Sequence, residues 1–282
     1  MVLPMPAACH LSFPFILPAK NTFFWQLSDP GLIKETFLLG TMHVQDLRAF
    51  SNLEFIKEKI DSADAFAAEY HLGDKNMGLA AKLGLPAGVS LNGLIPEKKY
   101  FKLRKIILKS TGIDLDYFQN ISPFMLTGLI GSQLLGKHMP QSLDEHLWNY
   151  ARDHNKTMLG IETFEEQIQV LEQIPLDDQV KMLLGLGKNI NRFRKHTLHS
   201  ANLYQQGKFK QLTKSVIKNA GKLRKVLVYQ RNEIMADRIH ALAQGQRLFA
   251  TVGAGHLGGG KGVLRLLKRK GVKVSPVFQS DN

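Results

Sequence analysis

Short apolar runs typical of buried strands occur near both ends of the chain. Some alternate with polar residues and others are continuously apolar, and both patterns are typical of strands in a sheet. The segments with this character are residues 23–27, 36–41, 63–70, 157–161, 248–252 and 272–277. Because the first three and the last two are separated by more than 170 residues, we expect one sheet to draw strands from both chain ends.

Helical spacing of apolar residues dominates the rest of the chain. The helical stretches are residues 53–60, 76–136, 142–151, 176–240 and 262–270, with breaks at Pro86, Pro96 and Pro123. Ser51 is the expected N-cap of the first helix, and Thr163 with Glu166 three residues later predicts a capping box. Gly271 is positioned to close the last helix.

These elements predict an α/β fold. We expect a central sheet, mostly parallel or mixed, with a large helical insertion. Residues 1–20 are interpreted as an N-terminal extension, such as a degenerate signal, and residues 21–282 as a single domain whose middle, 76–245, is mostly helical. No internal run approaches the roughly 18 apolar residues of a membrane-spanning helix. The first nineteen residues lack the features of a convincing secretory signal, so the sequence leaves the cytoplasm and the periplasm or exterior both open.

The amino-acid composition adds one unusual feature, a large excess of positive charge. The chain has 282 residues, 44% of them hydrophobic, and one cysteine, which excludes an intrachain disulfide. Its 37 Lys and Arg exceed 24 Asp and Glu, for a net charge of +13. Between Asp178 and Glu233 there is no acidic residue, while thirteen are basic.

Four lysines of this basic stretch recur every fourth residue, on one face of a helix. They are Lys210, Lys214, Lys218 and Lys222. Such a stripe can bind an acidic protein or anionic lipid, or it can be a solvated face. Aromatic residues are sparse around it, which disfavours single-stranded nucleic acid as the partner.

The segment GAGHLGGGKG at 253–262 follows a strand and precedes a helix, and three interpretations compete. It matches the dinucleotide fingerprint G-x-G-x-x-G, but no acidic residue follows at the required distance of about 20 positions. It also matches G-x-x-x-x-G-K of phosphate loops, but Gly262 replaces the Ser or Thr that binds Mg²⁺. The third interpretation is a strand-end turn that brings the backbone and His256 close to a ligand.

A second strand end has the same spacing of glycine and histidine. Gly40 precedes His43 as Gly253 precedes His256, and Glu69 lies at the end of another apolar run. If these strands are neighbours, two imidazoles and a carboxylate would meet. Such a set suits Mn²⁺, Co²⁺, Fe²⁺ or Zn²⁺ with positions left open for water.

Five blocks of the sequence resemble the TraB/GumN family, whose metazoan relatives include the Tiki peptidases. They are LLGTMHVQD, AFAAEY, SLDEHLWNYARDHNKTMLGIETFEEQ, YQRNEIMADRI and ATVGAGHLGGGKGVLRLLKRKGVKV, in the family's order. The resemblance implies an α/β fold of the erythromycin esterase and ChaN type, and metal-dependent peptide cleavage in the Tiki branch. It implies His43, Glu69 and His256 as the metal-binding or catalytic set.

Two further residues fall in the family-like blocks. We predict Glu162 as a general base and Arg231 as a clamp for a developing oxyanion. Their structural alternatives are a helix-entry carboxylate for Glu162 and a surface ion pair with Glu233 or Asp237 for Arg231.

Three functions follow from these residues. The first is a metal-dependent hydrolase acting on a peptide or another small molecule. The second is a non-catalytic regulatory or binding protein that uses the basic helical face. The third is an esterase-like hydrolase that needs no metal and uses His43 as its base. Metal identity, substrate and oligomeric state are not specified by the sequence.

Overall fold

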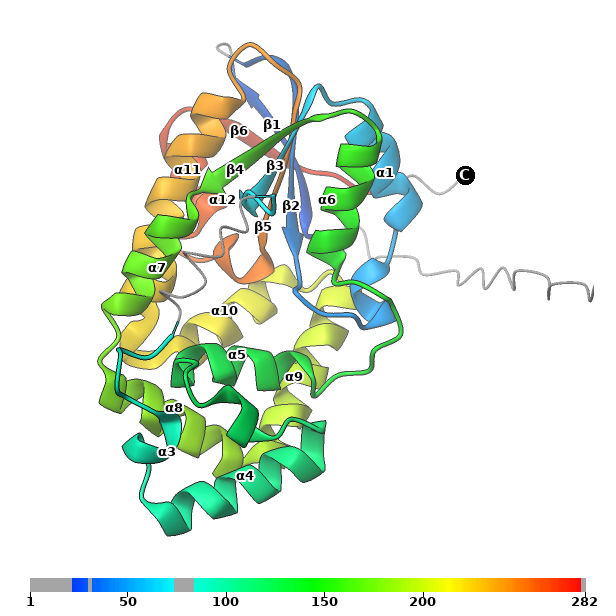
Figure 1. Cartoon of the computed structure of the whole chain (residues 1–282). Coiled ribbons are helices and arrows are strands. Elements are labelled where there is room, and N and C mark those ends of the chain that lie inside the picture. The colour runs from blue at the N-terminus through cyan, green and yellow to red at the C-terminus, as the bar shows by residue number, and fades with distance from the viewer. Residues whose placement is uncertain (1–21, 30–31, 74–83, 280–282) are drawn as a thin grey trace, which may run out of the picture.

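The computed structural model describes residues 22–29, 32–73 and 84–279 (Figure 1). The predicted extension at 1–20 and the start of the helical stretch at 76–136 lie outside these residues. The strands are β1 Phe24–Asp29, β2 Leu32–Thr41, β3 Ala65–Tyr70, β4 Thr157–Glu162, β5 Leu248–Gly253 and β6 Lys273–Pro276.

The strands form one six-stranded mixed sheet in the order β4-β3-β5-β2-β1-β6. The four strands β4, β3, β5 and β2 run parallel to one another, and β1 is antiparallel to both of its neighbours, β2 and β6. The predicted α/β class with a mixed sheet built from both chain ends is therefore confirmed. β2 begins at Leu32, earlier than the apolar run suggested, because its first residues pair with β1.

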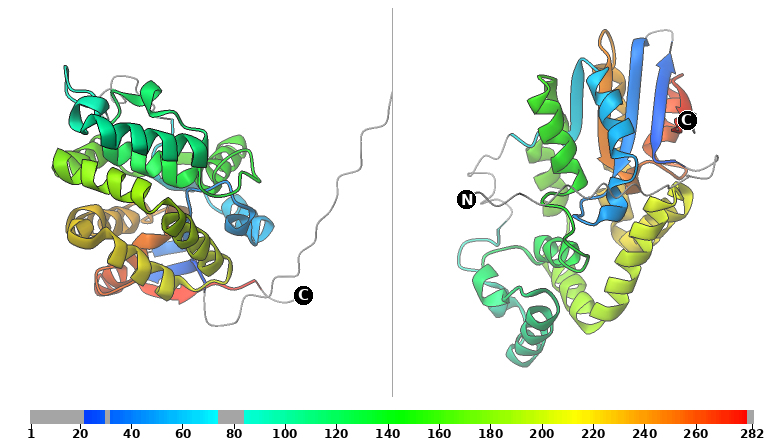
Figure 2. Two further views of the ribbon diagram at one scale, coloured as in Figure 1. Left: turned by 90° about the horizontal axis from the view of Figure 1, so that it is seen from below. Right: turned by 90° about the vertical axis from the view of Figure 1, so that its right-hand side faces the viewer.

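The helices cover both faces of the sheet, and some of them extend beyond the carboxyl ends of its parallel strands. They are α1 Leu53–Asp61, α3 Leu91–Leu94, α4 Glu97–Thr111, α5 Pro123–Ser132, α6 Leu143–Asp153, α7 Phe164–Glu172, α8 Leu176–Lys188, α9 Ile190–Gln205, α10 Phe209–Ala220, α11 Arg231–Leu242 and α12 Val263–Arg269. Short 3₁₀ turns occur at Leu47–Phe50, Leu115–Phe118, Gly221–Leu223 and Ala254–His256, and a π-helix at Lys225–Gln230 leads into α11. Figure 2 shows α4, α5, α8 and α9 gathered beyond one end of the strands.

Local sequence signals explain some helix starts and not others. The capping box of Thr163 and Glu166 begins α7, as predicted, and an equivalent box at Ser142 begins α6. Ser51, however, is not the N-cap of α1. Asn52 holds that position in the left-handed region at φ 62°, without a side-chain capping bond, because Ser51 ends the preceding 3₁₀ turn.

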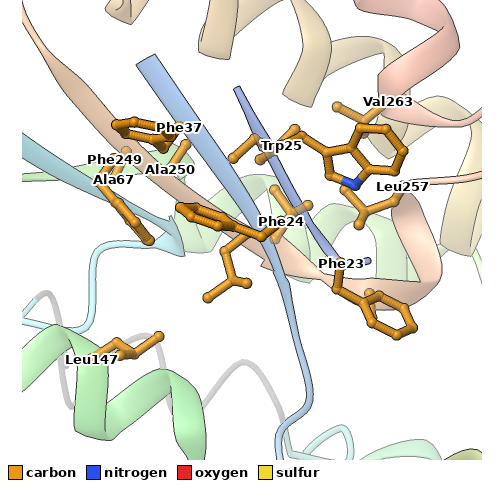
Figure 3. Packing of buried hydrophobic residues seen from close by; sticks show 14 of the residues in the cluster. Phe23, Phe24, Trp25, Phe37, Ala67, Leu147, Phe249, Ala250, Leu257 and Val263 are labelled. Carbon is orange, nitrogen blue, oxygen red and sulfur yellow. The ribbon is translucent and has the colours of Figure 1, made fainter. Parts of the chain in front are cut away.

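The sheet is packed on both faces by hydrophobic side chains. On one face Phe24 packs against Phe37 and Phe249, while the next residue, Trp25, points to the other face toward Leu257 and Val263 (Figure 3). A second hydrophobic cluster joins α3, α4, α5, α8 and the start of α9. This helical cluster lies beyond the carboxyl ends of the parallel strands, where open α/β sheets bind ligands (Figure 1).

Candidate functional site

Four neighbouring parallel strands each bring a polar side chain to the same edge of the sheet. Glu162 ends β4, Glu69 lies near the end of β3, His43 follows β2 and His256 follows β5. The end of β2 packs closely against the loop after β5, since a Cβ built on Gly40 would lie 2.5 Å from Leu257 Cδ1. The repeated G-x-x-H spacing thus leads two histidines from adjacent strands into one site.

His43 is paired with Asp144 from the first turn of α6. Its Nδ1 lies 2.9 Å from Asp144 Oδ2, while the other oxygen, Oδ1, accepts a short hydrogen bond from Thr41 Oγ1. The Asp144 side chain is 11% exposed and that of His43 is 57% exposed. The Asp144 charge raises the pKa of His43 to about 9, so at pH 7 the ring is a cation with a proton on each nitrogen. Its Nδ1 faces Asp144, and its Nε2 is turned toward Glu69, 3.9 Å from Oε2.

Glu69, Arg231 and Glu162 form a buried ion triad. The first residue of α11, Arg231, donates through Nη2 to both carboxylates and through Nε to Glu162, with Nε–O distances of 3.1 Å. Burial alone would raise the pKa of Glu69, but Arg231, the two histidines and the Gly253 N–H, at 2.8 Å, hold it well below its usual range. Burial raises the pKa of Glu162, whose side chain is only 1% exposed.

This triad excludes the surface ion pair with Glu233 or Asp237 that was the structural alternative for Arg231, because the guanidinium is turned inward between two buried carboxylates. Glu162, in turn, directs both of its oxygens at Arg231 rather than at the solvent.

His256 is oriented by Asn232, the second residue of α11. The Asn232 amide donates from Nδ2 to the Lys261 carbonyl at 2.7 Å, which leaves Oδ1 facing His256 Nδ1 at 2.6 Å. Because an amide oxygen only accepts, Nδ1 of His256 must carry the proton and Nε2 the lone pair. Burial lowers the pKa of His256 to about 4, so the ring is neutral at pH 7.

The three predicted side chains converge on Gly253. A Cβ built on this glycine would lie 3.2 Å from Glu69 Oε2, 3.4 Å from His256 Cδ2 and 3.9 Å from His43 Nε2. The structure therefore brings His43, Glu69 and His256 together, although among its described residues no group of three or more His, Cys, Asp or Glu is arranged to hold a metal ion.

A cleft of about 570 Å³ opens above this edge. Its floor includes His43, Glu69 and Asp144, whereas His256 and Arg231 do not line it. One wall is α5, through side chains that include Phe124, Met125 and Leu129, and Leu129 is 38% exposed. The arrangement offers a polar, partly charged floor and an apolar wall to a bound molecule.

Two residues of the site were not singled out from the sequence. Asp144 follows the capping serine of α6, where an acidic residue is ordinarily explained by the helix dipole. Its signal was its place in a family-like block, and nothing local shows that it reaches His43. Asn232 follows Arg231 in the family-like block YQRNEIMADRI, and its contact with His256 depends on packing between α11 and the strand-end loop.

The four lysines of the basic stripe do not all line one surface. Lys210 and Lys214 line a second groove, on the face of the sheet that carries Trp25. Lys218 and Lys222 are exposed outside this groove. Within the described residues, no helix is long and apolar enough to cross a membrane.

Comparison with known proteins places this site in a family. The model of the TraB/PrgY/gumN family matches residues 23–276, nearly the whole chain, and the protein belongs to that family. Among curated proteins, the chain is 22% identical to the Metalloprotease TIKI1 of Danio rerio and 25% identical to the Metalloprotease TIKI2 of the same organism. These matches cover 95% and 92% of this chain but only 65% and 63% of the relatives, so the chain spans less than two thirds of their length. No solved structure matches the chain.

Proposed function

We propose that this protein is a metal-dependent hydrolase that cleaves peptides. The observation that carries the proposal is the convergence of His43, Glu69 and His256 on Gly253, at the carboxyl ends of adjacent parallel strands. The distant relatives named metalloproteases support the same class of reaction.

The donor groups fit a divalent ion of the first transition series. Each histidine has its Nδ1 beside a fixed oxygen, Asp144 for His43 and Asn232 for His256, so each would bind an ion through Nε2. The Nε2 of His256 is unprotonated at pH 7, whereas an ion bound to His43 would displace a proton from its Nε2. With Glu69 the two histidines make a set of two imidazoles and one carboxylate, suited to Mn²⁺, Co²⁺, Fe²⁺ or Zn²⁺. A bound ion would supply a water molecule of lowered pKa.

The charge around the site is also compatible with a cation. Three carboxylate groups, Glu69, Glu162 and Asp144, surround one guanidinium, and these four groups sum to a formal charge of −2, which protonation of His43 reduces to −1. In the described arrangement the Glu69 oxygens accept hydrogen bonds from Arg231 and from the Gly253 N–H. Small side-chain rotations are therefore needed before Glu69 and the two histidines can bind one ion.

The remaining residues position these ligands. Both oxygens of Glu162 face Arg231 and its side chain is 1% exposed, so we now propose it as a positioning residue for Arg231 in place of a general base. Arg231 then holds Glu69 in place, and a role as an oxyanion clamp would require it to leave one of its two carboxylates. Asp144 and Asn232 hold the two imidazoles in the required tautomers.

The cleft suits a peptide segment with an apolar side chain. The α5 wall would bury such a side chain, while Gln45, Gln133 and Ser132 offer polar groups to a peptide backbone. Burial of one Leu- or Phe-sized side chain contributes roughly 1.5–3 kcal/mol, enough to place a scissile bond.

Metal content and peptidase activity test this proposal together. Elemental analysis of the purified protein after incubation with Mn²⁺, Co²⁺ or Zn²⁺ should give about one ion per chain, and a peptide library should be cleaved. His43→Ala and His256→Ala should lose the ion and lower activity by at least about 100-fold. His199→Ala, on the exposed face of α9, is the matched control and should change neither. Full metal content in both site variants would refute the ligand assignment.

The Asp144–His43 pair supports a second candidate, a hydrolase without metal. A carboxylate beside Nδ1 is the arrangement that orients a histidine acting as a general base. Chelation separates the two: activity that survives excess chelator and metal-free buffers would assign the reaction to this pair. Absence of cleavage of peptide and ester libraries, with metal present, would instead support the non-catalytic binding protein.

A further inference from the structure

A second groove lies between α10 and α12, outside the proposed hydrolase site. It has a volume of about 630 Å³. Its apolar lining residues are Trp25, Phe209, Ile217, Leu257, Leu264 and Val274. They come from strands and helices that meet at the β1–β6 side of the sheet, and all except Ile217 are less than 9% exposed, so they form the floor of the groove.

Four cations rim this apolar surface. Lys210 and Lys214 are four residues apart on α10, and Arg265 and Lys268 are three residues apart on α12, so each pair shares one face of its helix. All four are exposed, and none forms an ion pair with another described residue. No acidic side chain is among the described residues that line the groove. An anion is therefore favoured at the rim.

One buried polar group in the groove has no partner within the described part of the chain. Trp25 is 8% exposed, yet its indole Nε1 is buried without a hydrogen-bond acceptor. Buried N–H groups in folded proteins are almost always paired, since an unpaired donor costs about 1–3 kcal/mol. The indole therefore belongs to the buried floor of the groove, and a molecule bound in the groove would change its surroundings.

The Gly-rich segment shapes one boundary of the groove. A Cβ on Gly258 would lie 2.9 Å from Thr213 Oγ1, so this segment contacts α10 directly. Gly259 has φ +91°, a left-handed conformation that turns the chain between α10 and α12. The two glycines thus allow the groove to be lined by backbone as well as by apolar side chains.

We propose that this groove binds a single-chain anionic amphiphile, such as a long-chain carboxylate. The acyl chain would occupy the apolar surface, and the head group would lie among Lys210, Lys214, Arg265 and Lys268. A simple anion would leave the apolar surface exposed, and an uncharged chain would leave the four cations unneutralised. Only a ligand with both parts matches the groove.

Trp25 itself reports on occupancy. The chain has two tryptophans, Trp25 and Trp148, so the Trp148→Phe variant leaves Trp25 as the single fluorophore. Titration of this variant with monomeric dodecanoate should change the Trp25 emission saturably, with one ligand per chain. Dodecanol keeps the alkyl chain without the charge, and inorganic phosphate keeps a negative charge without the chain. Each should bind at least about 10-fold more weakly than dodecanoate.

Charge variants locate the head group. In the Trp148→Phe background, K214Q/R265Q removes one cation from each side of the groove and should weaken dodecanoate binding by roughly 10-fold. K218Q/K222Q is the matched control, since it removes two nearby exposed lysines that do not line the groove, and should change the affinity by less than about 2-fold. Neither pair touches the proposed metal ligands, so metal content should stay unchanged.

Three results would overturn the proposal. Equal affinity for dodecanol and dodecanoate would reduce the groove to an apolar surface. Equal weakening in K218Q/K222Q would assign binding to the diffuse positive charge. Binding only to phosphatidylglycerol vesicles, with no response to monomeric dodecanoate, would show a membrane-surface contact in place of a ligand groove.

Discussion

Arg231→Met removes the guanidinium that lies between Glu69 and Glu162. The Arg231 side chain is 14% exposed and its two partners are 12% and 1% exposed, so the substitution leaves two carboxylates with little access to water. Methionine keeps much of the apolar stem, which limits the cavity. The main consequence is therefore electrostatic: two buried negative charges lose their shared cation and repel each other.

The expected loss is large for a single side chain. Removing one partner from a buried ion pair costs about 3–5 kcal/mol. For a chain of this size a loss of 1 kcal/mol lowers the melting temperature by about 2–4 °C. Calorimetry or thermal circular dichroism at pH 7 should thus show a decrease on the order of 6–20 °C. The double variant E162Q/R231M removes one of the two uncompensated charges, and it should recover roughly half of this loss.

Arg247→Met provides the control, because its ion pair has similar geometry and a different environment. Arg247 Nη2 lies 2.5 Å from Asp64 Oδ1, but the two side chains are 49% and 35% exposed. An exposed pair contributes at most about 1 kcal/mol, or a few degrees. A melting temperature of Arg231→Met within a few degrees of that of Arg247→Met would refute the argument that burial makes the triad costly to break.

The remaining predictions concern two glycines and one acidic residue. Gly253→Ala should reduce metal content while changing the melting temperature by only a few degrees, because its φ of −53° suits alanine and the new Cβ would lie 3.2 Å from the Glu69 carboxylate. Gly262→Ala should destabilise the fold strongly in the same melting assay, since its Cβ would lie 2.2 Å from a backbone carbonyl oxygen. The Arg48 guanidinium, against a smaller effect of burial, lowers the pKa of Asp46, so this pair's stabilisation should be complete above about pH 4 and decline as the pH falls through the lowered value. Denaturant titrations of wild type and Asp46→Asn between pH 2 and 7 should converge at low pH, and a constant difference would contradict this.

The sheet was predictable because each strand carries its own hydrophobic signal. The runs at 36–41 and 248–252 are apolar on both faces, as expected of central strands packed on both sides, and they became β2 and β5. Pairing order was not predictable from these runs alone, since all of them present similar apolar surfaces. The shared G-x-x-H spacing of β2 and β5 required only that the two strands be neighbours for their histidines to meet, and the structure shows that they are adjacent.

The side chains that orient the site were harder to predict. Asp144 and Asn232 lie in the first turns of α6 and α11, and local rules explain an acidic or amide residue there without any distant partner. Their contacts with His43 and His256 depend on how these helices pack on the sheet. Arg231 shows the same limit, because the sequence left a site role and a surface ion pair within its own helix both open, and only the tertiary fold shows the guanidinium turned inward.

The Gly-rich segment borders both the proposed metal site and the proposed amphiphile groove. Asn232 holds it at both ends, through His256 on one side and the Lys261 carbonyl on the other. His256 faces the strand edge where Glu69 and His43 converge, whereas Gly258 and Gly259 line the groove against α10. Because glycine has no side chain to fill either space, the segment can pass between sheet and helix and border both. The match of this segment to nucleotide-binding motifs thus follows from its need for close backbone approach, and the residues around it point to different ligands: a metal ion at the strand edge and an amphiphilic anion in the groove.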